Sequence, residues 1–219
     1  MVANLLDVTD DVSIEAALER LSAWMSQDGL EIQESMRAPA TDRELDELRR
    51  AIEPYEVPQE LITMLRWHNG QPREPASLPL LPLPEGPLLG TGDAVKSYKF
   101  LTEDLEPWQW CPLWVPILQH RWSQTGVEIV PDGPGVVVEA DFGNPHLTII
   151  SSSLAALLHA TADMAEAGLL PNPPYSERER LIAARAEQAG WSNWPHDRII
   201  PHDEEGSNWP ERWREASGL

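Results

Sequence analysis

The sequence predicts an α+β fold, and the order of three local patterns supports this class. Amphipathic helices come first, short apolar strands separated by turn residues follow, and an apolar helix comes after the strands. Helices and strands that occupy separate stretches of one chain are typical of α+β proteins. We therefore expect helices that pack on an antiparallel sheet.

Two helices near the N-terminus are marked by their caps. Apolar residues recur at helical spacing over residues 14–25, and Ser13 before them can serve as N-cap. Thr41 and Glu44 have the spacing of a capping box, and the apolar stripe that follows them stops at Pro54. We expect one helix over 14–25 and a second that begins at Thr41.

A third helix follows after a short turn. Proline is favoured in the first turn of a helix, so Pro58 predicts a start, and the apolar spacing continues as far as Gly70. We expect Gly70 to adopt the left-handed C′ conformation that ends many helices. Residues 93–105 predict one more short helix.

Residues 71–92 contain six prolines, which exclude a regular helix or a central strand because proline lacks the backbone N–H. Two hypotheses fit this proline-rich insert. It is either a polyproline ligand for an aromatic groove or an apolar connector that lies on its own domain. We favour the connector.

Four strands and a closing helix complete the domain. Turn-forming residues separate the last three strands, which predicts an antiparallel meander. Ser152 or Ser153 can cap a helix that runs to Ala167 and ends at Gly168. We expect the strands over residues 113–118, 126–130, 135–140 and 147–151.

The chain changes character from Pro171. A charged helix is expected over residues 176–189, and four tryptophans follow among prolines, glycines and acidic residues. Tryptophan buries a large apolar surface and is enriched at binding hot spots. We favour the hypothesis that Trp194, Trp209 and Trp213 hold the segment against the main domain over the hypothesis that they anchor a partner. Residues 171–219 are therefore predicted to be a helical and tryptophan-rich C-terminal extension.

Composition argues against several classes of partner. The 219 residues include 36 acidic and 16 basic side chains, which gives a net charge of −20. Binding to nucleic acid or to anionic lipid depends on basic residues, so we expect neither partner. The single cysteine, Cys111, excludes an internal disulfide, and acidic residues stand near the N-terminus where a secretion signal would be basic. We expect a cytoplasmic protein without a membrane anchor.

The sequence contains no recognisable catalytic or cofactor-binding motif. The phosphate-binding loop, the dinucleotide-binding glycine pattern, the nucleophile elbow and the zinc-protease motif are all absent. An enzyme would need a site assembled from distant segments around His68, His120 or His146. We expect no enzymatic activity, no metal and no cofactor.

The distribution of charge suggests where a partner would bind. Residues 122–175 contain neither lysine nor arginine but several acidic residues. A folded domain with this pattern is expected to present a strongly negative face, either for solubility alone or to steer a basic partner. The residues that we expect to contact such a partner are Glu128, Asp132, Glu139 and Asp141.

Residues 38–71 resemble the signature of the SUKH superfamily, which includes fungal cell-wall assembly regulators of the Smi/Knr type and many bacterial immunity proteins. In that signature a proline and a threonine open a helix with an acidic and leucine stripe. A second helix then starts at a proline and ends in an aromatic residue, a polar pair and a glycine. The matching residues are Pro39, Thr41, Glu44, Leu45, Leu48, Pro58, Leu61, Leu65, His68, Asn69 and Gly70.

The resemblance implies an SUKH-like fold for residues 1–170, with helices packed on a curved, mostly antiparallel sheet and with residues 71–92 as an insert. Residues 114–117 are similar to the tryptophan and proline strand of the family. We interpret Asn69 and Gly70 as a helix stop. The structural motif would then comprise Trp67, His68, Asn69, Gly70, Trp114 and Pro116.

The function that the resemblance implies is protein binding without catalysis. The first hypothesis is an immunity protein that neutralises a cognate toxin through a basic surface of that toxin. A nuclease is one target that suits a carboxylate-rich inhibitor, because carboxylates mimic phosphate charge. The alternative is a regulatory scaffold in cell-wall or envelope signalling, which would dock its partner on the proline-rich insert or on the tail tryptophans.

Overall fold

The structure is a computed structural model that describes residues 13–72, 80–81, 86–105, 110–119, 123–130, 135–141, 146–170 and 196–199, with the backbone alone for residues 30, 141, 146–147 and 196–199. The predicted α+β class is confirmed. The helices are α1 (Ile14–Met25), α2 (Leu30–Ser35), α3 (Asp42–Ile52), α4 (Gln59–Trp67), α5 (Thr91–Lys99), a π-helix (Phe100–Asp104) and α6 (Leu154–Glu166). The strands are β1 (Trp114–Gln119), β2 (Ser123–Glu128), β3 (Val137–Asp141), β4 (His146–Ser151) and β5 (His196–Ile199).

The helices with strong local caps form where the sequence predicts them. Ser13 Oγ accepts the N–H of Ala16 at the start of α1. Thr41 Oγ1 accepts the N–H of Glu44, and the Glu44 carboxylate accepts the N–H of Thr41, so the capping box is confirmed. Ser153 caps α6 in the same manner by accepting the N–H of Ala156. These local hydrogen bonds fix three helix starts.

The strands form one antiparallel sheet in the order β1-β2-β3-β4-β5, which confirms the predicted meander. The second strand begins at Ser123 rather than at residue 126, because Ser123, Gln124 and Thr125 pair with β1 and β3 despite their polarity. The fifth strand was not predicted; it pairs with β4. The helix expected over residues 176–189 and the tail tryptophans lie outside the described residues.

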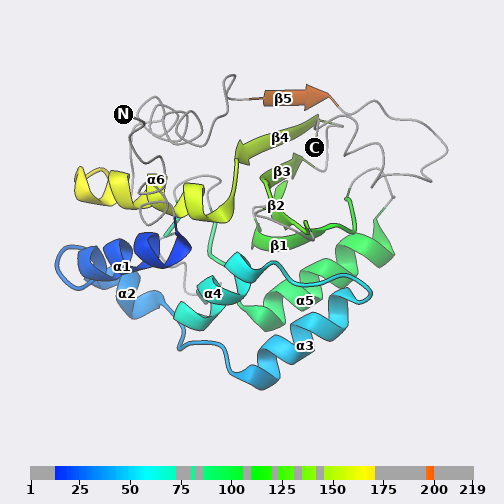
Figure 1. Cartoon of the computed structure of the whole chain (residues 1–219), viewed down its shortest axis with the longest axis horizontal. Coiled ribbons are helices and arrows are strands. Elements are labelled where there is room, and N and C mark those ends of the chain that lie inside the picture. The colour runs from blue at the N-terminus through cyan, green and yellow to red at the C-terminus, as the bar shows by residue number, and fades with distance from the viewer. Residues whose placement is uncertain are drawn as a thin grey trace, which may run out of the picture.

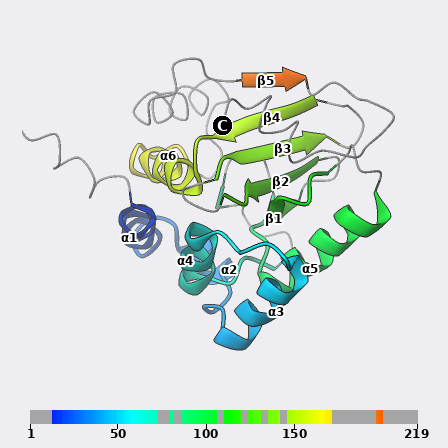
Figure 2. The same ribbon diagram turned by 45° about the vertical axis from the view of Figure 1, so that its right-hand side comes forward.

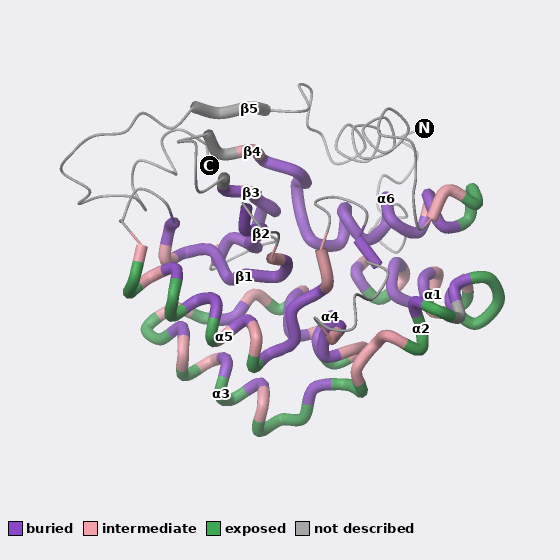
Figure 3. Tube along the Cα trace, turned by 180° about the vertical axis from the view of Figure 1, so that it is seen from behind, coloured by how far each residue is buried: buried purple, intermediate pink, exposed green. Residues whose placement is uncertain are grey.

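The elements are arranged around the sheet in two groups. Figures 1 and 2 show the strands stacked from β5 to β1, with α3, α4 and α5 beyond β1. The first helix contacts α6, and α6 contacts β4, whereas α5 contacts α3 and β1. Figure 3 shows that β1, β2, β3 and α6 are mostly buried, while exposed residues are concentrated on α1, α2, α3 and α5. Among the described residues, these helices therefore contribute much of the accessible surface.

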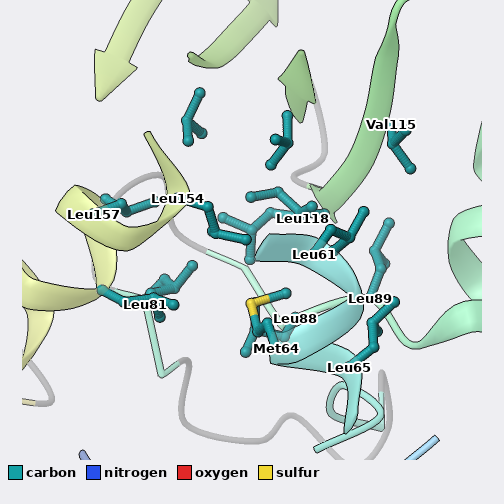
Figure 4. Close-up of a cluster of buried hydrophobic side chains, with 14 of the residues drawn as sticks. Leu61, Met64, Leu65, Leu81, Leu88, Leu89, Val115, Leu118, Leu154 and Leu157 are labelled. Carbon is teal, nitrogen blue, oxygen red and sulfur yellow. The ribbon is translucent and has the colours of Figure 1, made fainter. Parts of the chain in front are cut away.

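The core joins α4, the insert, β1 and α6. Figure 4 shows their apolar side chains meeting in one cluster. Leu80 and Leu81, inside the proline-rich insert, have no exposed surface, and Leu88 and Leu89 are at most 2% exposed. A fully buried leucine contributes about 1.5–3 kcal/mol to stability. The described part of the insert therefore belongs to the core. This supports the connector hypothesis and not the ligand hypothesis. The residues labelled in the figure are Leu61, Met64, Leu65, Leu81, Leu88, Leu89, Val115, Leu118, Leu154 and Leu157.

Candidate functional site

Among the four predicted partner contacts, Glu128 must be corrected. It lies on β2 opposite Trp114 and is only 2% exposed, so it cannot present its charge to a partner. Glu139 on β3 is half-buried and accepts a hydrogen bond of 2.6 Å from the hydroxyl of Ser123. Asp132 lies outside the described residues, and only the backbone of Asp141 is described. The sheet therefore offers Glu139 alone as a described, partly accessible carboxylate of this set.

Two further acidic residues of the segment without lysine or arginine serve the fold. Asp163 and Glu166 on α6 form ion pairs of 2.7 and 2.6 Å with Arg20 on α1. The hydrogen bond to Glu166 is the main reason that the pKa of Arg20 is raised above its ordinary value. Arg20 also donates to Nδ1 of His159, whose Nε2 donates to the carbonyl oxygen of Ser13. The predicted negative face is thus partly neutralised where α1 meets α6.

Residues 68–70 follow α4 in the chain and contact the start of α5. The ring of His68 donates from Nδ1 to the carbonyl oxygen of Arg37 at 2.8 Å. Asn69 is 8% exposed; its Oδ1 accepts the N–H of Thr91 at 2.7 Å and its Nδ2 donates to Glu44 at 3.2 Å. Thr91 is the first residue of α5, whose own N-cap, Gly90, has no side chain. Asn69 therefore caps a helix that begins about twenty residues later in the chain, a role that its local sequence does not indicate.

The left-handed conformation predicted for Gly70 is confirmed, but its purpose differs from the prediction. The φ angle is +72°, and α4 already ends with His68 as its C-cap in an extended conformation. A side chain at Gly70 would lie 2.3 Å from the backbone nitrogen of Gly90. The glycine is required because two backbone segments cross there, and not only because a helix stops.

Trp67 links the end of α4 to α1. Its indole nitrogen donates to the hydroxyl of Ser22 at 2.8 Å, and its ring lies edge-on to His68 at 4.6 Å. Trp114 and Pro116 of the same predicted motif are fully buried on β1, with Trp114 packed edge-on against Trp110. All six residues of the predicted structural motif therefore pack within the fold rather than forming an exposed site.

Gln71 binds two described segments of the insert next to residues 68–70. It is 1% exposed, its Nε2 donates to Ser35, and its Oε1 accepts the N–H groups of Leu80 and Leu88. Its own backbone N–H donates to the carbonyl oxygen of Leu88. The side chain of Gln71 therefore fixes the backbone of the insert at Leu80 and at Leu88.

Glu60 on α4 caps α6 from a distance of more than ninety residues in sequence. Its Oε2 accepts the N–H groups of Leu154 and Ala155 at 3.0 and 3.3 Å. Burial raises the pKa of the Glu60 carboxyl, and the neighbouring charge of Glu15 raises it further, whereas the two N–H groups lower it. This carboxylate links α4 to α6 and cannot serve as an exposed contact at the same time.

Exposed carboxylates that form no ion pair with a described residue occur on α1, on α2 and in the turn between them, and also at Glu53, Glu56, Glu103 and Asp104. We define the α1–α2 acidic surface as five exposed residues, none of which forms an ion pair with a described residue. None of them is among the predicted contacts, although acidic residues four apart on the outer side of a predicted helix are a recognisable signal. The five are Glu15, Glu19, Asp28, Glu31 and Glu34.

The acidic residues of α3 differ from this surface because arginines neutralise them. Arg49 pairs with Asp46 and Arg66 pairs with Asp42. Arg43 approaches Glu47 at 3.8 Å. Residues 14–35 contain only one basic residue, Arg20, which is directed to α6. The five residues of the α1–α2 acidic surface are therefore exposed carboxylates without a neutralising arginine among the described residues.

The described residues contain no group of three or more histidine, cysteine, aspartate or glutamate side chains arranged to hold a metal ion. Cys111 is a buried thiol, and His68 is occupied by the carbonyl oxygen of Arg37. His120 lies outside the described residues, as does the side chain of His146. Nor does this part of the chain include a helix both long and apolar enough to cross a membrane.

No family model and no curated protein matches the chain.

Proposed function

We propose that the protein is a non-enzymatic protein-binding module of the SUKH type, an immunity protein that neutralises a cognate toxin with a basic surface. The α1–α2 acidic surface carries this proposal, since it combines exposure with a lack of neutralising partners among the described residues. Clusters of like charge on one face attract an oppositely charged partner and raise the rate of association. The proposed contact therefore moves from the sheet to α1 and α2.

The placement of these acidic residues supports a binding role over a purely structural one. Glu15 and Glu19 are four residues apart on the exposed side of α1, opposite Ala17 and Leu21, which are buried. Glu31 and Glu34 occupy the exposed side of α2. Like charges at this spacing destabilise a helix slightly, which opposes the favourable interaction of Glu15 and Glu31 with the N-terminal ends of their helices.

The regulatory scaffold of the Smi/Knr type is less well supported. Its proposed docking element, the proline-rich insert, contributes Leu80, Leu81, Leu88 and Leu89 to the core. Deleting residues 72–87 would therefore unfold part of the core and would not separate loss of a docking site from loss of structure. Substitution of exposed residues is the more informative test.

The test uses the C-terminal module of the protein encoded immediately upstream as the toxin. We expect expression of this module to stop growth of a host cell and co-expression of the chain to restore growth. A triple variant, Glu15→Gln, Glu19→Gln and Glu31→Gln, is expected to associate with the module about tenfold more slowly at low salt, with a weaker dependence on salt. Stopped-flow fluorescence measures both quantities.

The control variant removes the same number of charges from α3, where arginines neutralise them: Asp42→Asn, Asp46→Asn and Glu47→Gln. We expect a change of less than twofold in the association rate. Equal slowing in both variants would mean that only net charge matters and that the α1–α2 acidic surface has no specific role. Failure of the wild-type chain to bind the module or to restore growth would contradict the immunity function itself.

A further inference from the structure

The outer face of α5 and of the π-helix that follows it carries an ordered strip of exposed side chains. Lys96 and Lys99 are exposed, Phe100 is 47% exposed, and Glu103 and Asp104 are exposed beyond it. We call these five residues the α5 strip. Residues three to five apart share one face of such a helix. The strip therefore presents positive, apolar and negative groups in that order.

The two lysines are unusual in this chain. They are its only lysines, and neither forms an ion pair with a described residue. The arginines with described side chains are all engaged: five pair with carboxylates, and Arg50 donates to the carbonyl oxygen of Asp46. Lys96 and Lys99 thus keep their charge available for a contact outside the described part of the chain.

Phe100 adds an apolar centre to this strip. It is the only large hydrophobic side chain that is exposed among the described residues. The opposite side of α5 is anchored, because Tyr98 and Leu101 are buried and the Tyr98 hydroxyl donates to the carbonyl oxygen of Pro112 at 2.8 Å. The strip is therefore held on a fixed helix and cannot turn inward to cover Phe100.

The order of charges makes the strip complementary to itself. When two copies of the strip meet in antiparallel orientation, Phe100 of each copy lies near the two-fold axis. Lys96 of one copy then faces Asp104 of the other, and Lys99 faces Glu103, since both pairs are centred on residues 100–101. A self-complementary patch of this kind is what a two-fold symmetric interface requires.

We propose that the α5 strip is the contact of a symmetric dimer, whose occupant is a second copy of this chain in antiparallel orientation. This inference does not depend on the proposed function. Figures 1 and 2 place α5 at the end of the molecule opposite α1 and α6, so two copies joined through α5 keep their α1–α2 acidic surfaces far apart. Repulsion between these two surfaces is then weak, because it falls off with distance in salt.

Open space along α5 is consistent with such close approach. No heavy atom of the described residues outside its own helical turn lies within 4 Å of the position that a side chain would take at Gly92. Gly92 is four residues before Lys96 and is exposed. A strip of about three helical turns buries less area than a standard interface, so the dimer is weak and transient.

The test is sedimentation equilibrium of the full chain at about 0.15 M salt, where repulsion between distant charges is screened. We expect a concentration-dependent dimer in the wild-type protein. Variant K96E/K99E and variant E103K/D104K should each be monomeric, because like charges then face one another across the two-fold axis. A mixture of these two variants should form a heterodimer more tightly than either associates with itself.

Two controls separate this contact from general electrostatics. Arg50→Glu reverses an exposed charge on α3, and we expect no change in its dimerisation. The quadruple variant K96E/K99E/E103K/D104K preserves the complementarity in reverse order and should dimerise as the wild type does. A wild-type chain that remains monomeric up to about millimolar concentration overturns the proposal, as does a dimer that survives K96E/K99E or a mixture that does not associate.

Discussion

The acidic residues of α1 and α2 and those of residues 122–170 have opposite roles in this molecule. Glu128 is buried, Glu139 accepts a hydrogen bond from Ser123, and Asp163 and Glu166 bind Arg20. The acidic residues of α1 and α2 make no such described contacts. Carboxylates inside a segment without basic residues can still be neutralised by a distant arginine. The number of charges in a segment therefore does not tell which of them reach the surface.

Substitutions should distinguish the two sets, since changes at internal polar contacts are expected to reduce stability, whereas changes on α1 and α2 are expected to leave stability nearly unchanged and, under the proposed function, to slow association. The largest loss of stability is expected at Gly70, beside Asn69. Gly70→Val combines a left-handed φ with a Cβ 2.3 Å from the nitrogen of Gly90. We expect the free energy of unfolding to fall by about 4 kcal/mol, from backbone strain and overpacking together. Urea denaturation measures the change.

Gly168 offers a matched control for this substitution. Its φ of +68° is nearly the same, but no described atom lies within 4 Å of the position of its side chain. Gly168→Val should therefore cost only about 1–2 kcal/mol, from backbone strain alone. Equal losses at the two glycines would show that the crossing of backbone segments at Gly70 is unimportant.

An intermediate effect is expected where α1 meets α6. Arg20→Met leaves Asp163 and Glu166 without their guanidinium group, and both ion pairs are partly shielded from solvent at Arg20. We expect a loss of about 1–2 kcal/mol in the free energy of unfolding, reduced from the value of a buried pair by the solvent exposure of Glu166. Arg43→Met, at an exposed pair on α3, should change the free energy of unfolding by less than about 0.5 kcal/mol.

The smallest effect concerns the Glu60 cap and depends on pH. Burial raises the folded-state pKa of Glu60 above the unfolded value of 4.5. The stability from this shift is therefore fully present below pH 4.5 and is lost as pH rises through the folded pKa. Glu60→Gln does not titrate, so the stability of wild type relative to this variant should decline as pH rises. Urea denaturation between about pH 4 and 7 measures it.

Glu15 provides the check on this interpretation. Its charge raises the pKa of Glu60. In the Glu15→Gln variant the folded-state pKa of Glu60 should be lower, so the stability should decline over a narrower pH range than in the wild type. A stability difference between wild type and Glu60→Gln that does not vary with pH would contradict the assigned shift.

The sequence was sufficient for elements whose signals are local. Ser13, the Thr41–Glu44 pair and Ser153 bond to backbone groups within three residues, so their helices were predicted from short segments. The start of β2 was missed because Ser123 and Gln124 are polar, and their burial depends on both neighbouring strands. The short helix α2 was missed because its N-cap, Gly29, provides no side-chain cap.

The candidate site was harder to predict for the same reason. Glu128 and Glu139 are ordinary acidic residues in the sequence, and only the packing of β2 and β3 makes one buried and the other half-buried. Asn69 and Glu60 cap helices that begin far away in the chain, and no spacing rule connects them to Thr91 or Leu154. Roles that depend on contacts between distant segments are decided by the tertiary structure.

The short pairing of the insert with β1 has a consequence for solution behaviour. Leu88 forms an antiparallel bridge with Leu118, and the N–H of Leu89 donates to the carbonyl oxygen of Ile117. Unsatisfied backbone groups along the outermost strand of a sheet invite strand addition by other chains. Residues 88 and 89 occupy part of this edge at Ile117 and Leu118, and Pro87 beside them lacks the N–H that a ladder needs. The described residues of the insert thereby leave less of β1 open to strand addition by another chain.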